Sequence, residues 1–217
     1  NGAGSLSWST AGVGGATTID GLTDGYANYT NHNIMLGSGI AASLSGGTNN
    51  YGWGSGTTFA ALSTGSGNIA IGRDANKAVS TQLNNIGIGE NTLYSLSSSA
   101  SHNNVAVGTD ALFNNSSGVG ANNSAFGTSA GKQLGGDNNT AVGYSALING
   151  GSISDNTAIG RSAGANSDGS SSVYVGSSAG YQSAGDENVY VGNDSAFTNS
   201  GSSDGDRNTA IGARAMG

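Results

Sequence analysis

One short phrase recurs along the chain from residue 33 to its end, and its plainest copy is Asn-Thr-Ala-Val-Gly-Tyr-Ser-Ala at 139–146. Positions are numbered here from the phrase glycine, so this copy runs from −4 to +3. Successive phrase glycines lie 16 to 20 residues apart. Self-similarity at a nearly fixed period predicts a stacked repeat array. The phrase glycines are Gly37, Gly54, Gly72, Gly89, Gly108, Gly127, Gly143, Gly160, Gly176, Gly192 and Gly212.

Each position of the phrase has its own residue type. Position −4 is asparagine in ten of the eleven copies, with Ser172 as the exception, and position −1 is always apolar. Position −3 is mostly β-branched and position −2 mostly small. This alternation predicts a strand of about four residues per repeat. We expect position −1 to be buried and position −2 to let another backbone approach. A small residue returns at +3, so we also expect a second short strand beyond the glycine.

The composition favours strands and tight turns. Glycine supplies 40 of 217 residues, only 9% are charged and proline is absent, which suits a ladder that needs nearly every backbone N–H. We predict an all-β solenoid, a parallel β-roll or β-helix of about eleven short rungs over 33–217, preceded by a connector at 1–32. Asparagine would close turns and form hydrogen-bonded ladders, and glycine would mark sharp turns. The structural positions expected from this pattern include Asn68, Gly72, Asn85, Gly89, Asn104, Gly108, Asn139, Gly143, Asn156 and Gly160.

Several classes of function are disfavoured. The formal net charge of −7 argues against a nucleic-acid partner. Without cysteine there is no disulfide framework or thiol site, and no apolar run is long enough to predict a membrane span. The two histidines, His32 and His102, are far apart in sequence, so we expect neither a metal nor a cofactor. The chain starts at Asn1, which suggests a piece of a longer product.

Paired carboxylates are the strongest hint of catalysis. Asp186 with Glu187 and Asp204 with Asp206 form local pairs, and glycosidases use two carboxylates. Both pairs, however, lie in Gly/Ser-rich insertions beside a phrase asparagine, where acidic residues commonly cap turns. We therefore expect that the protein is not an enzyme.

Length variation is expected only between the small residue at +3 and the next asparagine. In repeat proteins, insertions on one face often form the binding surface. The candidate contact loops are Ser97–His102, Asn114–Gly120 and Asn199–Asp206, the last including Asp204.

Aromatic residues recur at position +5. Flat rings there could stack on sugars, but their regular spacing favours a packing role. These residues are Phe59, Tyr94, Phe113, Tyr181 and Phe197.

The runs NNTAVGYSALING, DNTAIGRSAGANS and NNVAVGTDALFNN resemble the repeats of phage tail-fibre proteins that end in a self-cleaving intramolecular chaperone. They are also similar to the head repeats of trimeric autotransporter adhesins. The resemblance covers about 33–217, and the loose spacing favours the tail fibres. The segment Thr18–Gly25 also looks like the lead-in of such fibres. The family implies a homotrimer of parallel β-rolls on a virion or cell surface, with other fibre or tail proteins and a host surface glycan or protein as partners.

Thin rungs argue independently for a trimer, because a rung of about 17 residues encloses little core of its own. The small-residue column at −2 was the expected contact between subunits. The expected function is an extracellular fibre or adhesin component, a phage tail fibre on the virion that contacts the host cell. The alternatives are a purely structural trimeric shaft or spacer, or the head of a bacterial trimeric surface adhesin.

Overall fold

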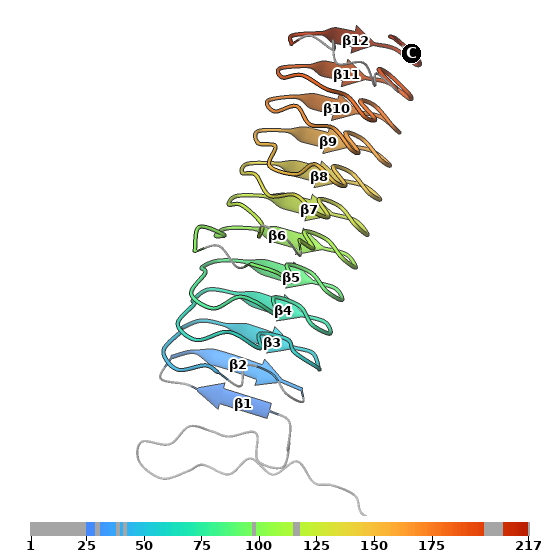
Figure 1. The fold of residues 1–217 in the computed structure, drawn as a ribbon. Coiled ribbons are helices and arrows are strands. Elements are labelled where there is room, and N and C mark those ends of the chain that lie inside the picture. The colour runs from blue at the N-terminus through green and yellow to red at the C-terminus, as the bar shows by residue number, and fades with distance from the viewer. Residues whose placement is uncertain are drawn as a thin grey trace, which may run out of the picture.

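The protein is a rod of stacked rungs in the computed structural model, which describes residues 25–28, 31–37, 40, 43–96, 99–114, 118–197 and 206–216 (Figure 1). Its strands form one 12-stranded sheet in chain order. The strands are β1 (Gly25–Asn28), β2 (Asn33–Leu36), β3 (Tyr51–Trp53), β4 (Ile69–Ile71), β5 (Ile86–Ile88), β6 (Val105–Val107), β7 (Ser124–Phe126), β8 (Thr140–Val142), β9 (Thr157–Ile159), β10 (Val173–Val175), β11 (Val189–Val191) and β12 (Thr209–Ile211).

Strands β2 to β12 pair in parallel with the phrase in register, for example Thr140 with Thr157 and Val142 with Ile159. The all-β parallel solenoid expected from the repeat is confirmed. Strand β1 pairs antiparallel with β2, so the sheet begins inside the segment expected as a connector. Residues 1–24 of that segment lie outside the described part.

The phrase glycines stack in one column, as expected. The N–H of Gly143 donates to the carbonyl of Phe126 in the preceding rung at 2.8 Å. Gly143 has a φ of +131°, and a Cβ placed there would lie 2.5 Å from the carbonyl oxygen of Gly160. Both left-handed backbone and close approach of the next rung therefore require glycine at this position.

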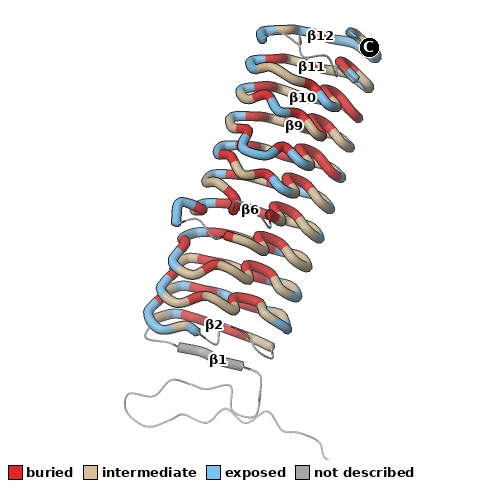
Figure 2. The backbone as a smooth tube through the Cα atoms, in the orientation of Figure 1, coloured by how far each residue is buried: buried red, intermediate tan, exposed pale blue. Residues whose placement is uncertain are grey.

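The two faces of the strands are the reverse of the expectation. The small residues at −2 face the core, where Ala141 is 1% exposed and Ala158 is fully buried, whereas Ile159 at −1 is 44% exposed. In most rungs the space inside the strand holds only alanine or glycine, and Met35, Tyr174 and Tyr190 are the large exceptions. The bulk of the core instead comes from the segment after the glycine, through residues such as Leu93 and Leu147. Figure 2 shows the resulting alternation of buried and more exposed positions around every rung.

No second strand follows the glycine within the described residues. This segment is a run of turns in which every second residue is left-handed, as at Ser145, Leu147 and Asn149, with φ of 56°, 49° and 60°. The N–H groups of Ser145 and Asn149 donate to the preceding rung, and that of Leu147 donates to the following rung. The segment therefore bonds to both neighbours without extended backbone.

One rung departs from the fixed phrase length. Phe59 donates its N–H to Ala75 in the next rung, just as Leu93 does to Ala111. Phe59 is fully buried and left-handed, with a φ of 53°. It thus occupies the +4 core slot, and the phrase after Gly54 is one residue longer than expected. Phe59 is not a member of the outer aromatic column.

Candidate interaction surfaces

A buried ladder runs through the asparagines at −4. The N–H of Asn156 donates to Asn139 Oδ1 at 3.0 Å, and Asn139 Nδ2 donates to the carbonyl of Ile153 at 2.9 Å. Ser172 keeps the ladder intact, because its N–H donates to Asn156 Oδ1 and its Oγ accepts the N–H of Asn188. The predicted role of the asparagines in closing turns and forming a ladder is confirmed, and these side chains are not available to a ligand.

A second amide row lies on the surface at −5, and the sequence argument missed it. Side-chain amides donate from rung to rung over 3.0 to 3.2 Å. All its members have left-handed φ, a conformation that Asn and Asp tolerate. That preference, repeated in one column, was the available signal. The row consists of Asn84, Asn103, Asn122, Asn138 and Asp155.

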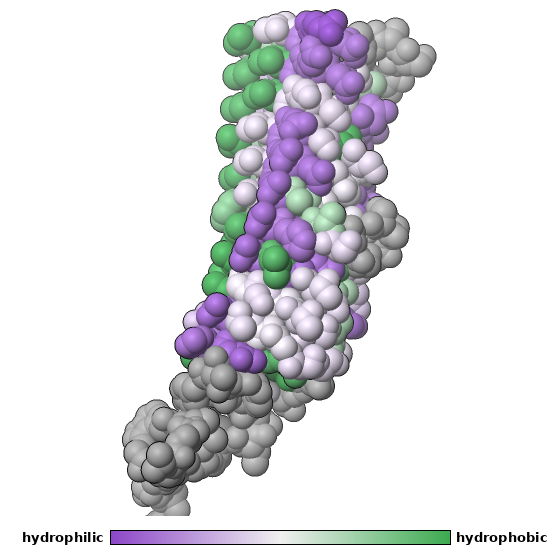
Figure 3. All heavy atoms as spheres, turned by 90° about the vertical axis from the view of Figure 1, so that its left-hand side faces the viewer, coloured by the Kyte–Doolittle hydropathy of each residue, from purple (hydrophilic) through white to green (hydrophobic). Residues whose placement is uncertain are grey.

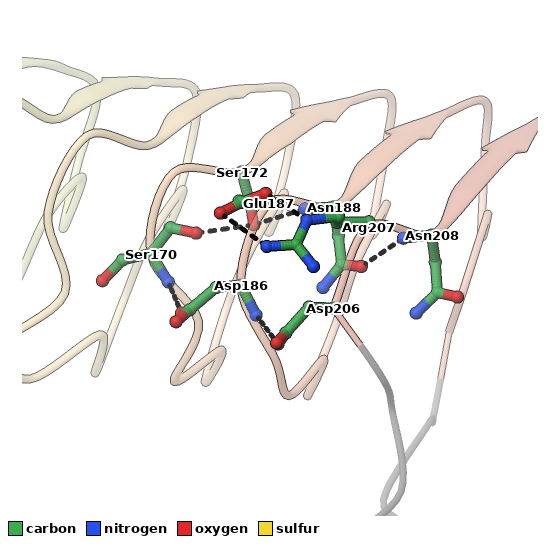
Figure 4. A network of polar contacts seen from close by, with 8 residues as sticks. All are labelled: Ser170, Ser172, Asp186, Glu187, Asn188, Asp206, Arg207 and Asn208. Atoms are coloured by element: carbon green, nitrogen blue, oxygen red, sulfur yellow. Dashed lines mark hydrogen bonds and ion pairs between the residues drawn. The ribbon is translucent and has the colours of Figure 1, made fainter.

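The acidic residues singled out for catalysis are hydrogen-bond acceptors of turns (Figure 4). Asp186 Oδ1 accepts the N–H of Ser170 at 2.7 Å, and Asp206 Oδ1 accepts the N–H of Asp186 at 2.9 Å. Glu187 Oε2 lies 2.7 Å from Arg207 Nε. Asp204 lies outside the described residues, so its predicted pairing with Asp206 cannot be placed.

His102 stands at position −6, the position that Asp186 and Asp206 hold in their own rungs. Its Nδ1 accepts the N–H of Leu83 at 2.9 Å. Among the described residues, no group of three His, Cys, Asp or Glu side chains could hold a metal ion.

The described ends of the candidate loops anchor the chain. Asn114 is 1% exposed, and its Nδ2 donates to the carbonyls of Gly118 and Leu134 at 2.8 and 3.2 Å. Its predicted role as a contact residue is therefore wrong. The carbonyl of Gly120 accepts Asn104 Nδ2 at 2.8 Å. Asp206 is exposed. The remaining candidates, Ser97 and Asn199, lie outside the described residues.

The outer aromatic column forms a closed stack in the middle of the rod. The ring centroids of Tyr94 and Phe113 are 4.9 Å apart. Lys77 Nζ lies 4.6 Å from the centroid of Tyr94, and Lys132 Nζ lies 5.3 Å from that of Phe113. Each ring thus has a protein neighbour on both sides along the stack, which leaves its faces covered. This geometry favours packing over sugar stacking at these rings.

Polar contacts hold both lysines of this stack. Lys77 Nζ donates to Tyr94 Oη at 2.7 Å, and this hydrogen bond raises the pKa of Lys77. Lys132 Nζ lies 3.0 Å from Asp110 Oδ2. Partial burial would raise the pKa of Asp110, but the hydrogen bonds from Lys132 and Asn91, with the charge of Lys132, together lower it.

A second aromatic pair lies near the C-terminal end, where the ring centroids of Tyr181 and Phe197 are 5.1 Å apart.

The outer face of the sheet carries exposed apolar side chains along the described rod. Its exposed side chains occupy positions −3 and −1 of successive strands, and Trp53 is 66% exposed. Figure 3 shows a hydrophobic column along the rod with a hydrophilic column beside it. The largest apolar patch on a soluble monomer is often functional, so the face is a candidate interaction surface. The exposed members include Ile34, Tyr51, Trp53, Ile71, Ile88, Phe126, Ile159 and Ile211.

No protein-family model, curated protein or solved structure matches this chain. Across the part of the chain that the structure describes, no helix has the length and apolar character needed to cross a membrane.

Proposed function

We propose that the chain is an extracellular fibre component, a phage tail fibre on the virion, that contacts the host cell surface and catalyses nothing. The observation that carries the proposal is the unbroken rod. The −4 ladder links every rung from Asn33 to Asn208, and such continuous bonding suits a stiff spacer between a particle and a surface. The repeat resemblance supports the same conclusion, and it also fits the head of a bacterial trimeric adhesin.

The proposed assembly is a homotrimer, joined to other fibre or tail proteins. The −2 column cannot supply its contacts, because that column fills the core of each chain. The exposed outer face of the sheet can supply the contacts between subunits. Ten spacings of about 4.8 Å between strands, multiplied by a strand length of about 10 Å, give a face of roughly 500 Å². This is near the upper range of apolar patches left exposed on monomers.

The proposed host contact, a glycan or a protein, lies at the inserted loops. Their described ends are fixed to the rod by hydrogen bonds such as that from Asn114 Nδ2 to the carbonyl of Leu134. All three insertions occupy the same segment of the repeat. Weak binding at each loop would be strengthened by three copies per fibre and several fibres per particle. A purely structural shaft remains the alternative, because the anchoring contacts serve a spacer equally well.

Adsorption to the host distinguishes these functions. The three loops at 97–102, 114–120 and 199–206 would be shortened together to the 16-residue period found elsewhere in the chain. If the loops contact the host, the rod should keep its assembly and thermal stability while adsorption falls. A matched control would shorten no loop but carry Thr64→Ser and Thr81→Ser on the exposed side of the early rungs. Unchanged adsorption by an intact, loop-shortened rod would leave the shaft as the function.

A further inference from the structure

Several departures from the repeat meet at one place in the core. Tyr174 and Tyr190 stand at −2, where most rungs have alanine. Ser172 replaces the −4 asparagine in the same rung as Tyr174. At position +7, where other rungs have Val79, Leu96 or Leu134, the two rungs that enclose Tyr174 have serine. These serines are Ser167 and Ser183.

Glycines make room for the tyrosine rings. Positions +4 of the same two rungs are Gly164 and Gly180, where Leu93 and Leu147 stand in other rungs. A Cβ on Gly164 would lie 2.7 Å from Tyr174 Cδ2, and one on Gly180 would meet the same ring. The ring of Tyr174 therefore takes the volume that leucine fills elsewhere. Its hydroxyl extends toward the +7 position, where serine replaces the apolar residue.

The tyrosine hydroxyls are buried without a protein partner. Tyr174 and Tyr190 are fully buried, and neither Oη makes a hydrogen bond to the described residues. A buried hydroxyl left unpaired costs about 1–3 kcal/mol in general. Burial raises the pKa of Tyr174, and the nearby hydroxyls of Ser172, Ser167 and Ser183 oppose that rise, although none of them meets Tyr174 Oη in hydrogen-bond geometry.

The serine oxygens retain accepting capacity. Ser167 Oγ donates its proton to the carbonyl of Gly164 at 2.8 Å, and Ser172 Oγ donates to the carbonyl of Ser170 at 3.1 Å. A hydroxyl oxygen that donates still offers lone pairs. The site thus combines a buried tyrosine hydroxyl that needs a partner with serine oxygens that can accept.

We propose that Tyr174, Ser167, Ser172 and Ser183 enclose an internal hydration site that holds ordered water. A buried water typically makes about three hydrogen bonds to polar groups that would otherwise be unsatisfied. Water here accepts the proton of Tyr174 Oη and donates to serine oxygens. The proposal also accounts for Ser172, since a hydroxyl preserves the −4 ladder while its short side chain leaves space beside Tyr174.

Removal of the hydroxyl tests the site, because Tyr174→Phe keeps the ring and its packing. The control is Tyr144→Phe, which removes a hydroxyl from a side chain that is 60% exposed. Tyr174→Phe should favour unfolding by about five-fold in the equilibrium constant, the effect of losing one ordinary hydrogen bond, and the control should change it little. A high-resolution crystal structure should show water within hydrogen-bond distance of Tyr174 Oη.

Two results would overturn the proposal. One is a Tyr174→Phe variant as stable as the unmodified chain, or more stable, which would mean that the hydroxyl gains nothing from its surroundings. The other is a crystal structure in which Tyr174 Oη donates directly to a serine oxygen with no water between them. Neither result would bear on the fibre function.

Discussion

Left-handed backbone is the main peculiarity of this chain at the scale of single residues. At +2 it falls mostly on Asp, Asn and Ser, and Asp and Asn, as at Asp110 and Asn91, tolerate it. At +4 it falls on Leu112 and Leu147. A left-handed L-residue costs roughly 1–2 kcal/mol, whereas burying a leucine side chain stabilises by about 1.5–3 kcal/mol. Because Leu112 and Leu147 are fully buried, burial offsets the strain of the backbone that directs them into the core.

Glycine is needed in the turns either for left-handed backbone or for close approach of the next rung, and two glycines distinguish these reasons. Gly143→Ala should destabilise more than Gly151→Ala, because a Cβ on Gly143 meets the next rung's backbone, whereas one on Gly151, at a φ of +61°, meets nothing within 4 Å. Strain alone predicts about 1–2 kcal/mol at Gly151. We expect the loss at Gly143 to exceed it clearly in urea unfolding. Equal losses at the two sites would mean that close approach of the rungs contributes nothing.

The residue scale is also where sequence reasoning had its clearest limits. Asparagine and glycine have few structural uses. A repeated column of asparagine therefore predicts turns and a hydrogen-bonded ladder, and one of glycine predicts sharp turns. Leucine at +4 has no conformational preference that reveals a left-handed backbone. The sequence pattern predicts the wrong column for Phe59. Gly54 and Gly72 lie 18 residues apart, against 17 for the intervals on either side, but the spacing does not show that the extra residue falls inside the phrase rather than after it.

At the scale of elements, side-chain ladders do much of the work usually done by long strands. Each described strand from β3 onward has only three residues, too few to be stable alone. In the −4 ladder, side chains just before each strand accept N–H groups of the next rung. At position −6, side chains such as Asp186 accept N–H groups of the preceding rung. Asp186 and Asp206, which suggested catalysis, accept turn N–H groups in this column, a bonding pattern that sequence spacing alone does not show.

Substitutions at Asn139 measure the −4 ladder. Asn139→Ser should keep an oxygen for the N–H of Asn156, as Ser172 does for Asn188, and lose the bond to Ile153. Asn139→Ala should leave both groups unsatisfied in a buried position. We expect about 1 kcal/mol of lost stability for serine and about 2–4 kcal/mol for alanine, measured by chemical denaturation. Equal losses would mean that the acceptor oxygen is unimportant.

Acid should weaken the stack that contains Asp110. Its pKa is lowered in the fold from about 3.9 in an unfolded chain. Its stabilising contribution is therefore complete above about pH 4 and is lost as the pH falls through the folded pKa. Asp110→Asn should reduce the loss of stability in this acid range, and Lys132→Met, which removes the charge partner, should do the same. An unchanged pH dependence in both variants would contradict this assignment.

At the scale of the whole molecule, the repeat predicted the architecture but not which face of the sheet is inside. Alternation defines two faces, and the larger residues at −3 and −1 suggested the buried one. The narrow rung reverses that choice, because only alanine or glycine fits inside most strands while Leu134 and Leu147 fill the core from the turns. The exposed apolar face is a consequence of this geometry, and it shifts the expected subunit contact from the −2 column to the outer face.

Charge placed on that face should separate the subunits of the proposed trimer. Ile71→Lys with Ile159→Lys would add two ammonium groups to side chains that are 39% and 44% exposed in the single chain. Burying either against another chain would carry a large desolvation cost. The control, Thr64→Lys with Thr81→Lys, places the same charges at exposed turn positions away from the strands.

Sedimentation and native mass measurement should find trimers for the unmodified chain and the control, and monomers or unfolded chains for the sheet-face variant. Circular dichroism would distinguish the last two, and unfolding on separation would indicate that the thin rungs need the contact to remain folded. A folded, monomeric unmodified chain would refute the trimer itself. A trimer that survives both lysines on the sheet face would instead place the subunit contact on another surface of the rod.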